Sequence, residues 1–154
     1  MIGIGILRSG DGLKWIRERV LYDGYIFSGI VGLGSATYYH RMSSAAPSPL
    51  HIFCECGKVL GCGYFVFYPV KKVDYDNTIH IKNDLYVTTP QRTICDMIEF
   101  SWNERILYES IERYHINFDV NELFRYAETR GLQEKLLYYF DTVDEYYKLV
   151  GYIG

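Results

Sequence analysis

The pattern of hydrophobic and polar positions changes character near residue 90. Before it, short runs of aromatic and β-branched residues are bounded by Gly, Asn or Asp, which is typical of strands joined by tight turns. These runs are residues 50–55, 64–70, 78–81 and 85–88. Strands this short and this closely spaced favour a small, mainly antiparallel sheet, because a tight turn brings the chain back beside the strand it has just left.

Apolar residues at helical spacing predict helices on both sides of these strands. Residues 30–42 fit a helix weakened by Gly32 and Gly34, which either allow close packing or delay the helix start to Ser35. Beyond residue 100 the helical period continues almost without interruption. The segments predicted there are a helix at residues 106–114, a helix capped by Asp119 and stopped by Gly131, a stripe at 132–143 and a last short helix at 144–153.

These elements and the chain length together predict a single α+β domain. Its 154 residues suffice for one ordinary hydrophobic core. We expect a mixed core of sheet and helices over residues 29–100, preceded by an N-terminal extension at residues 1–28 and followed by a helical tail at residues 101–154. The helices that begin at Ser35 and Pro90 should flank the sheet.

The joint between the last predicted strand and the helix after it is the most specific local signal. Thr89 can cap the helix with its hydroxyl, and Pro90 at the first helical position loses only a donor that has no partner. Arg92, Thr93 and Asp96 then become polar groups in the first two turns of an otherwise apolar helix. Arg92 and Asp96, four residues apart, either pair on the surface or hold a neighbouring loop, or they belong to a partner site.

Composition and charge narrow the functional classes. With 49% apolar residues, 23% charged residues, no apolar membrane span and no signal peptide, the chain is expected to be a cytoplasmic protein. Its net charge is −3, and residues 101–154 carry six Lys/Arg against ten Asp/Glu. This balance argues against a broad nucleic-acid interface, although Lys71 and Lys72 are candidate nucleic-acid contacts. The 16 tyrosines favour a protein-contact surface, including that of a homo-oligomer.

Residues that often carry catalysis are present, but not in catalytic spacing. The four histidines fall on different predicted elements, and the C-x-C-x₅-C spacing from Cys54 to Cys62 matches no usual zinc pattern. The nearest approach to a nuclease site is a group of turn residues: Asp74, Asp76, Asp84 and Lys82. His40 lies near a helix C-terminus, where a positive charge is favourable, and is interpreted as structural. We therefore expect no catalytic residue, no metal ligand, no cofactor and no enzymatic activity.

Two sequence blocks resemble a known family. Residues 88–96, TTPQRTICD, resemble the T-(S/T)-P-x-R-T-(aliphatic)-x-D signature of the AbiEi-type antitoxin family. Residues 35–43, SATYYHRMS, and residues 49–52, PLHI, are similar to the S-A-L-Y-L-H-G-L-(S/T) helix of this family and to the P-x-x-I-H-I/V strand that follows it. Such proteins are the antitoxin and transcriptional-regulator half of abortive-infection toxin–antitoxin pairs, which act in phage defence.

The resemblance implies a non-enzymatic antitoxin or regulatory domain that counteracts a nucleotidyltransferase toxin. It marks seven residues as partner-binding or structural parts of the motif: Ser35, Tyr39, His40, Thr89, Arg92, Thr93 and Asp96. Arg41 stands where the family usually has glycine, and Asn83 and Asp84 replace another glycine.

The DNA-reading part of the family is a winged helix-turn-helix, for which the residues before Ser28 are too few. We therefore expect weak DNA binding, or none, from this chain alone. The expected partner is the cognate toxin, contacted directly or indirectly. The alternatives are a nuclease-like enzyme and a plain protein-interaction or oligomerisation scaffold.

Overall fold

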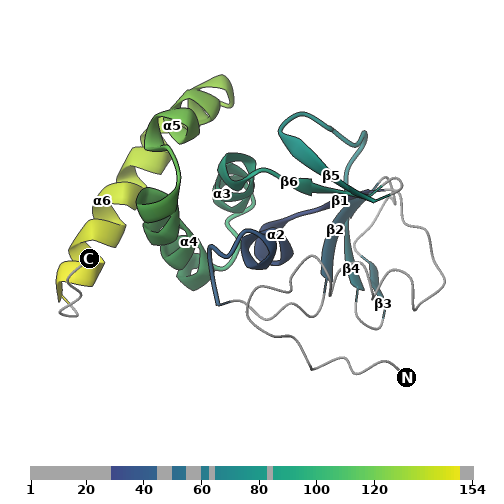
Figure 1. The fold of residues 1–154 in the computed structure, drawn as a ribbon, viewed down its shortest axis with the longest axis horizontal. Coiled ribbons are helices and arrows are strands. Elements are labelled where there is room, and N and C mark those ends of the chain that lie inside the picture. Colours follow the sequence, from purple (N-terminus) through teal and green to yellow (C-terminus); the bar gives the residue numbers. More distant parts are fainter. Residues whose placement is uncertain (1–28, 45–49, 55–59, 63–64, 83–84, 150–154) are drawn as a thin grey trace.

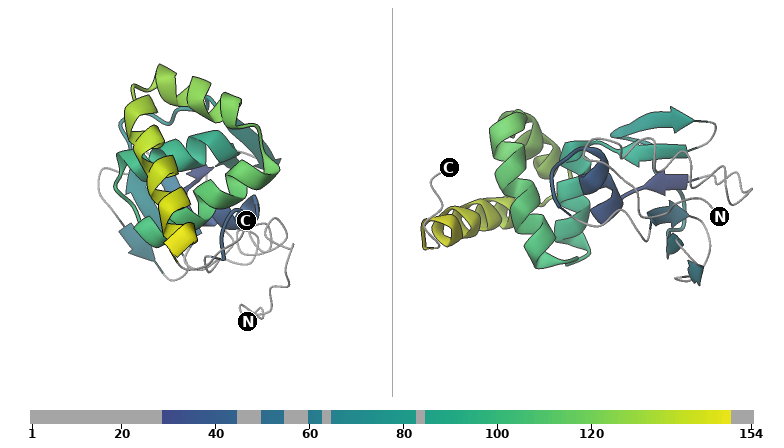
Figure 2. Two further views of the ribbon diagram at one scale, coloured as in Figure 1. Left: turned by 90° about the vertical axis from the view of Figure 1, so that its left-hand side faces the viewer. Right: turned by 60° about the horizontal axis from the view of Figure 1, so that its bottom comes forward.

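The fold of the chain is α+β, as predicted. The structure, a computed structural model, describes residues 29–44, 50–54, 60–62, 65–82 and 85–149. A sheet occupies one end of the molecule and a group of helices occupies the other (Figures 1 and 2). The N-terminal extension and the turns expected at residues 57–58 and 83–84 lie outside the described residues.

Within the described residues, six strands form one mixed sheet. They are β1 Gly29–Val31, β2 Leu50–Cys54, β3 Leu60–Cys62, β4 Phe65–Pro69, β5 Thr78–Lys82 and β6 Leu85–Thr88. In the order β3-β4-β2-β1-β6-β5, the pairs β1–β2, β3–β4 and β5–β6 are antiparallel, whereas β1–β6 and β2–β4 are parallel. The sheet is therefore mainly antiparallel, and all four predicted strands are part of it. β3 has no predicted counterpart, because a three-residue run shows no alternation to recognise.

β1 lies inside the sheet, so the prediction of a helix from residue 30 onward is wrong for residues 30–31. At Gly29 a Cβ atom would come within 2.8 Å of the Phe53 carbonyl oxygen, so glycine permits the close approach of β1 to β2. Ile30 and Val31 are fully buried and belong to different hydrophobic clusters, because successive strand residues face opposite sides. A short run buried on both faces lacks the alternation that identifies a strand, and this ambiguity explains the error.

The helices in the described part of the chain are α2 Leu33–Tyr39, α3 Pro90–Glu99, α4 Glu104–Asn117, α5 Val120–Thr129 and α6 Gln133–Leu149. α2 begins two residues before Ser35, and Asp119 caps α5 by accepting from the amide of Asn121. The predicted break at residue 144 is wrong, since α6 runs through it. No Gly or Pro interrupts residues 132–149, so nothing in the sequence stops that helix.

α2, α3 and α5 end in the same hydrogen-bonded turn. One residue after each helix cap takes a left-handed conformation, with φ of 59° at Arg41, 49° at Ser101 and 66° at Gly131. The amide of the next residue donates to a carbonyl five positions back, at 2.8, 2.9 and 2.8 Å respectively. This is the Schellman motif, so Gly131 is confirmed as a helix stop. Arg41 occupies the conformation that glycine adopts at the least cost.

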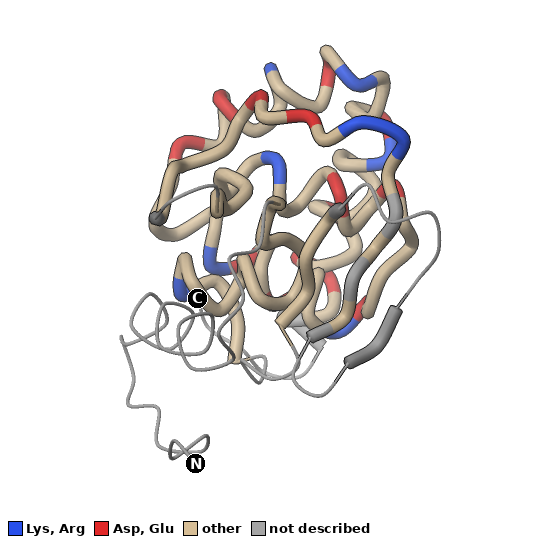
Figure 3. The backbone as a smooth tube through the Cα atoms, turned by 90° about the vertical axis from the view of Figure 1, so that its right-hand side faces the viewer, with Lys and Arg blue, Asp and Glu red and all other residues tan. Residues whose placement is uncertain are grey.

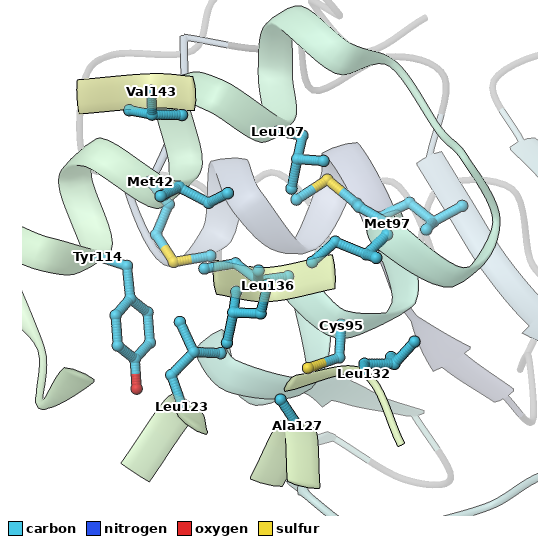
Figure 4. Packing of buried hydrophobic residues seen from close by; sticks show 14 of the residues in the cluster. Met42, Cys95, Met97, Leu107, Tyr114, Leu123, Ala127, Leu132, Leu136 and Val143 are labelled. Carbon is cyan, nitrogen blue, oxygen red and sulfur yellow. The ribbon is translucent and has the colours of Figure 1, made fainter. Parts of the chain in front are cut away.

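α3 is the centre of the packing. It contacts α2, α4, α5, α6 and β6. In Figure 4 its Cys95 and Met97 lie among Leu107 of α4, Leu123 of α5 and Leu136 of α6. All five side chains are almost fully buried, so one hydrophobic cluster joins α3 to the three C-terminal helices.

A second, smaller cluster joins α2 to the sheet. Its buried members are Val31, Ala36, Leu50, Ile52, Leu85 and Val87. Along β2, Leu50 and Ile52 belong to this cluster while Phe53 belongs to the larger one, as the two-residue period of a strand requires. The sheet is therefore buried on both faces at this strand.

Candidate functional site

Threonine hydroxyls hold the first turn of α3 against the end of β6. The Thr89 hydroxyl accepts from the amide of Arg92 at 3.3 Å, with Pro90 at the first helical position, which confirms the predicted cap. The Thr93 hydroxyl lies 2.7 Å from the Thr89 carbonyl oxygen and 2.6 Å from the Thr88 hydroxyl. Thr88 and Thr93 are fully buried, so these bonds fix the angle between strand and helix.

Arg92 connects α3 to the loop between β4 and β5. Its Nη1 donates to the carbonyl oxygens of Asp74 and Asp76, the second at 2.8 Å, and the Gln91 side chain donates to that of Asn77 at 3.2 Å. Arg92 is only 8% exposed. Of the two structural interpretations, the surface pair is therefore wrong and the held loop is correct. The loop carbonyls supply partners for guanidinium N–H groups that burial removes from water.

Asp96 is the buried centre of an ionic network. One carboxylate oxygen accepts from Arg92 Nε at 3.3 Å and the other from Arg130 Nη1 at 2.6 Å, and Asp96 is 4% exposed. Burial raises the pKa of the Asp96 carboxyl, and the positive charges of the two arginines oppose that rise. Asp96 thus joins the first turns of α3 to Arg130, the residue that follows α5, because each of its two oxygens accepts from a different arginine.

Arg130 extends this network to the end of α3. It donates to the Glu99 carboxylate, and to the Tyr126 hydroxyl at 3.2 Å, while its guanidinium lies 5.6 Å from the centre of the Tyr126 ring. Burial tends to lower the pKa of Arg130, but Asp96 and Glu99 outweigh it and leave the pKa above its ordinary value. We refer to Arg92, Asp96, Glu99, Tyr126 and Arg130 together as the Asp96 network.

Sequence reasoning did not identify Arg130, Glu99 or Tyr126. Arg130 lies 34 residues after Asp96, beside a predicted helix stop. A basic residue is common at a helix C-terminus, where it interacts favourably with the helix dipole, so its position alone suggests no tertiary role. The only available signal was the presence of Asp96 itself on an otherwise apolar helix, which required a cationic partner from elsewhere.

The first family-like block is tied to the second through His40. Its Nε2 donates to the Thr88 carbonyl oxygen at 2.6 Å, and the Tyr39 ring meets the His40 ring edge-on at 5.0 Å. Burial lowers the pKa of His40, and the hydrogen bond to Thr88 opposes this shift. The lowered pKa disfavours the positive charge that was expected near the end of α2. The Ser35 hydroxyl accepts from the His51 amide at 2.8 Å and so joins α2 to β2.

The side chain of His51 belongs to an aromatic group. Its ring lies 5.6 Å from the Tyr68 ring and 5.3 Å from the Trp102 ring. Within the described residues, the buried His51 Nδ1 has no hydrogen-bond partner. Burial lowers the pKa of His51 to about 4. The ring is therefore neutral at physiological pH and acts as a packing element.

A cleft of about 620 Å³ lies beside the Asp96 network. Its lining residues come from β2, the β4–β5 loop, α3 and α5: Phe53, Val70, Asp74, Asp76, Asn77, Arg92, Asp96, Glu99, Phe100, Tyr126, Thr129 and Arg130. We name it the α3–α5 cleft. Phe100 is 52% exposed and stacks on Phe53 at 5.7 Å between ring centres. The cleft thus combines an open aromatic ring with charged walls.

The two candidate nucleic-acid contacts lie in the same loop as part of this lining, between Val70 and Asp74. Lys71 and Lys72 are exposed in the bend after β4, and neither belongs to the residues that line the α3–α5 cleft. In Figure 3 the Lys and Arg positions of the described residues are distributed along the chain and interspersed with Asp and Glu.

The turn carboxylates form no metal site within the described residues. Asp74 and Asp76 are exposed, and the Asp74 side chain accepts from the Asp76 amide at 3.0 Å, the local turn bond expected of aspartate. Asp84 and the Lys82 side chain lie outside the described residues. In the described ranges, no three His, Cys, Asp or Glu residues are placed to share a metal ion.

Cys95 is a buried free thiol in the larger hydrophobic cluster. Burial raises its pKa to about 12, so the thiol stays protonated and packs as a small apolar group. The side chains of the other three cysteines lie outside the described residues.

No helix in the part of the chain that the structure describes has both the length and the apolar character needed to cross a bilayer.

The resemblance to the antitoxin family depends only on the two sequence blocks, residues 88–96 and residues 35–52. No protein-family model matches the chain, and a search of curated proteins finds no match to it.

Proposed function

We propose that this chain is a non-enzymatic antitoxin domain of a cytoplasmic toxin–antitoxin or abortive-infection system, and that it counteracts a nucleotidyltransferase toxin by binding a protein partner. The observation that carries the proposal is that the polar residues of residues 88–96, the block that resembles the antitoxin family, contact other parts of this chain. Arg92, Thr93 and Asp96 are buried and engaged in internal contacts. They build a surface rather than present a reactive group, whereas an acid or base in catalysis must reach a substrate.

The surface that they build is the α3–α5 cleft, which we propose as the contact site for the partner. The Asp96 network joins the β4–β5 loop, α3 and the end of α5, so the walls of the cleft are fixed to one another before binding. Because the walls are already fixed, less conformational entropy is lost when a partner binds. The exposed Phe100 ring adds the aromatic character that is enriched at protein interfaces.

The charges of the cleft favour a protein partner over DNA. Four carboxylates and two guanidinium groups line it. Both guanidinium groups already have carboxylate or carbonyl acceptors. Phosphate binding needs cations that can exchange their counterions, and these arginines are committed to internal acceptors. A regulatory role at a promoter would therefore need DNA contacts from outside this cleft.

Co-expression tests this proposal directly. A nucleotidyltransferase encoded beside this chain is expressed in bacteria at a level that arrests growth, with and without the full chain. The proposal predicts that the wild-type chain restores growth. It also predicts that Asp76→Lys, which reverses an exposed charge in the cleft, loses the rescue, whereas Asp141→Lys on the exposed side of α6 retains it.

Failure of the wild-type chain to restore growth contradicts the antitoxin function. Equal rescue by both lysine variants leaves the antitoxin function in place but removes the cleft from it. Metal-dependent cleavage of DNA or RNA by the purified chain, lost on changing Asp74, would replace the proposal with the nuclease-like alternative.

A further inference from the structure

The charges of the α3–α5 cleft do not cancel within the described residues. The guanidinium groups of Arg92 and Arg130 are matched by the carboxylates of Asp96 and Glu99. Asp74 and Asp76 remain on the loop, so the formal charge of the lining is −2. Both side chains are exposed. The cleft therefore offers two carboxylates beyond those that the arginines neutralise.

The lining of the same cleft also contains an exposed aromatic ring. Phe100, directly after α3, is 52% exposed and is held by its stack on Phe53. A guanidinium or ammonium group over an aromatic face gains cation–π attraction, and the gain grows as water is excluded. Arg130 over the Tyr126 ring, at 5.6 Å, already shows this contact inside the cleft.

We infer that the α3–α5 cleft binds an arginine or lysine side chain from an exposed segment of the protein partner. The cationic head lies beside the carboxylates of Asp74 and Asp76, which the arginines do not neutralise, and its aliphatic stem lies against Phe100. The identification of that partner as a toxin rests on the proposed function, whereas the cationic chemistry rests on the cleft alone.

The size and the lining of the cleft agree with this occupant. Its volume of about 620 Å³ lies within the range of roughly 300–1,000 Å³ that is typical of ligand sites, and it exceeds the space one side chain needs, so neighbouring partner residues can enter as well. An anionic ligand would meet a lining of formal charge −2 and two arginines with acceptors already in place. A wholly apolar ligand would strip water from the two exposed carboxylates of Asp74 and Asp76 without pairing them, which is costly.

Fluorescence anisotropy with the intact chain tests the inference. The probe is a fluorescein-labelled hexapeptide with two arginines between glycines, and the matched probe replaces both arginines by citrulline, which keeps the shape and removes the charge. We expect the arginine peptide to bind at least tenfold more tightly than the citrulline peptide, and its affinity to fall as salt is raised.

Variants of the chain locate the binding. The double substitution Asp74→Asn with Asp76→Asn removes the two carboxylates that the arginines do not neutralise and leaves the Asp96 network in place, and it should weaken the arginine peptide at least tenfold. Phe100→Ala should also weaken it. The matched control is Asp141→Asn with Glu145→Gln on α6, which removes two exposed charges outside the cleft and should leave the affinity unchanged. Thermal unfolding of each variant establishes that it is folded at the temperature of the measurement.

Equal affinity for the two peptides, no binding at millimolar peptide, or equal loss in the cleft and control variants would overturn the inference. Competition by a short oligothymidine that the cleft variants abolish would assign the cleft to an anionic ligand and overturn it as well. The two proposals fail separately: growth rescue without peptide binding overturns only the cationic occupant, and peptide binding without rescue overturns only the antitoxin function.

Discussion

Two helices of this molecule each contain an ion pair between residues four positions apart, but one pair is buried and the other is at the surface. In α3, Arg92 and Asp96 are four residues apart, pair at 3.3 Å, and have side chains that are 10% and 5% exposed. In α4, Glu109 and Arg113 have the same spacing and pair at 3.6 Å, with side chains 28% and 44% exposed. Spacing along a helix therefore predicts a pair, but not whether the pair is buried.

The two pairs differ in burial because residues distant in the sequence pack over the α3 pair. Asp96 receives Arg130, and Arg92 reaches the carbonyl of Asp74, 18 residues before it. Glu109 accepts from the amide and hydroxyl of Ser44, but its pair stays at the surface. Salt bridges in solvent contribute little, whereas breaking a buried one leaves an uncompensated charge. The α3 pair should therefore determine stability far more than the α4 pair.

The largest expected effect is the loss of Asp96. Asp96→Ala leaves the buried guanidinium group of Arg92 without its carboxylate and removes one of the two carboxylates that bind Arg130, and it should lower the free energy of unfolding by about 3–5 kcal/mol. Arg113→Ala breaks the exposed pair and should cost less than about 0.5 kcal/mol. Urea denaturation of both variants measures the difference. Similar losses would mean that burial does not distinguish the pairs, and Asp96→Asn serves where the alanine variant fails to fold.

The second prediction compares the pH dependence contributed by His51, which packs among aromatic rings, with that contributed by the exposed His115 on α4. Folding lowers the pKa of His51 from 6.5 to about 4, so between these values the unfolded chain binds more protons. Stability is then lost as pH falls through this interval, by up to about 1.4 kcal/mol for each pH unit. His51→Phe, which keeps an aromatic ring between Tyr68 and Trp102, should flatten the loss measured by urea denaturation at several pH values.

His115→Phe on α4 is the matched control, because it removes a histidine from an exposed position. His40 keeps part of the pH dependence in either variant, since burial also lowers its pKa. An identical pH profile for His51→Phe and wild type would contradict the account of the aromatic group.

The smallest effects concern the shared helix end. Gly131 has φ of 66°, and among the described residues a Cβ atom added there would meet open space. Gly131→Ala should therefore lower the unfolding free energy by about 1 kcal/mol through backbone conformation alone. At the equivalent turn of α3, the exposed Ser101 has φ of 49°, and Ser101→Gly should raise stability by a few tenths to about 1 kcal/mol. Thermal unfolding measures both, and changes of the same sign would contradict the assignment of one motif to both helix ends.

Local chemistry made a large part of the fold predictable. The Thr89 cap, the Gly131 stop and the strand that ends at Thr88 depend on neighbours within a few residues, and the sequence contains those neighbours. β1 was missed because its two faces are buried by distant segments, which removes the alternation that identifies a strand. The continuity of α6 was missed although no Gly or Pro interrupts residues 132–149.

The candidate site was predictable only in part. Arg92, Thr93 and Asp96 were identified from their polarity on an apolar helix, and that signal is local. Their acceptors and donors are not, because the Asp74 carbonyl and Arg130 come from the β4–β5 loop and the end of α5. The cleft itself follows from those tertiary contacts, so no pattern along the chain predicts it.

The central claim is that the signature residues act by holding the β4–β5 loop and α5 against α3, and the unfolding free energy of Arg92→Ala tests it most directly. The account predicts a loss of about 2–3 kcal/mol by urea denaturation, because hydrogen bonds from a charged group to Asp96 and to two loop carbonyls disappear. Unchanged stability in this variant, together with the loss of nanomolar binding to one promoter at physiological salt, would contradict the claim and place Arg92 on DNA.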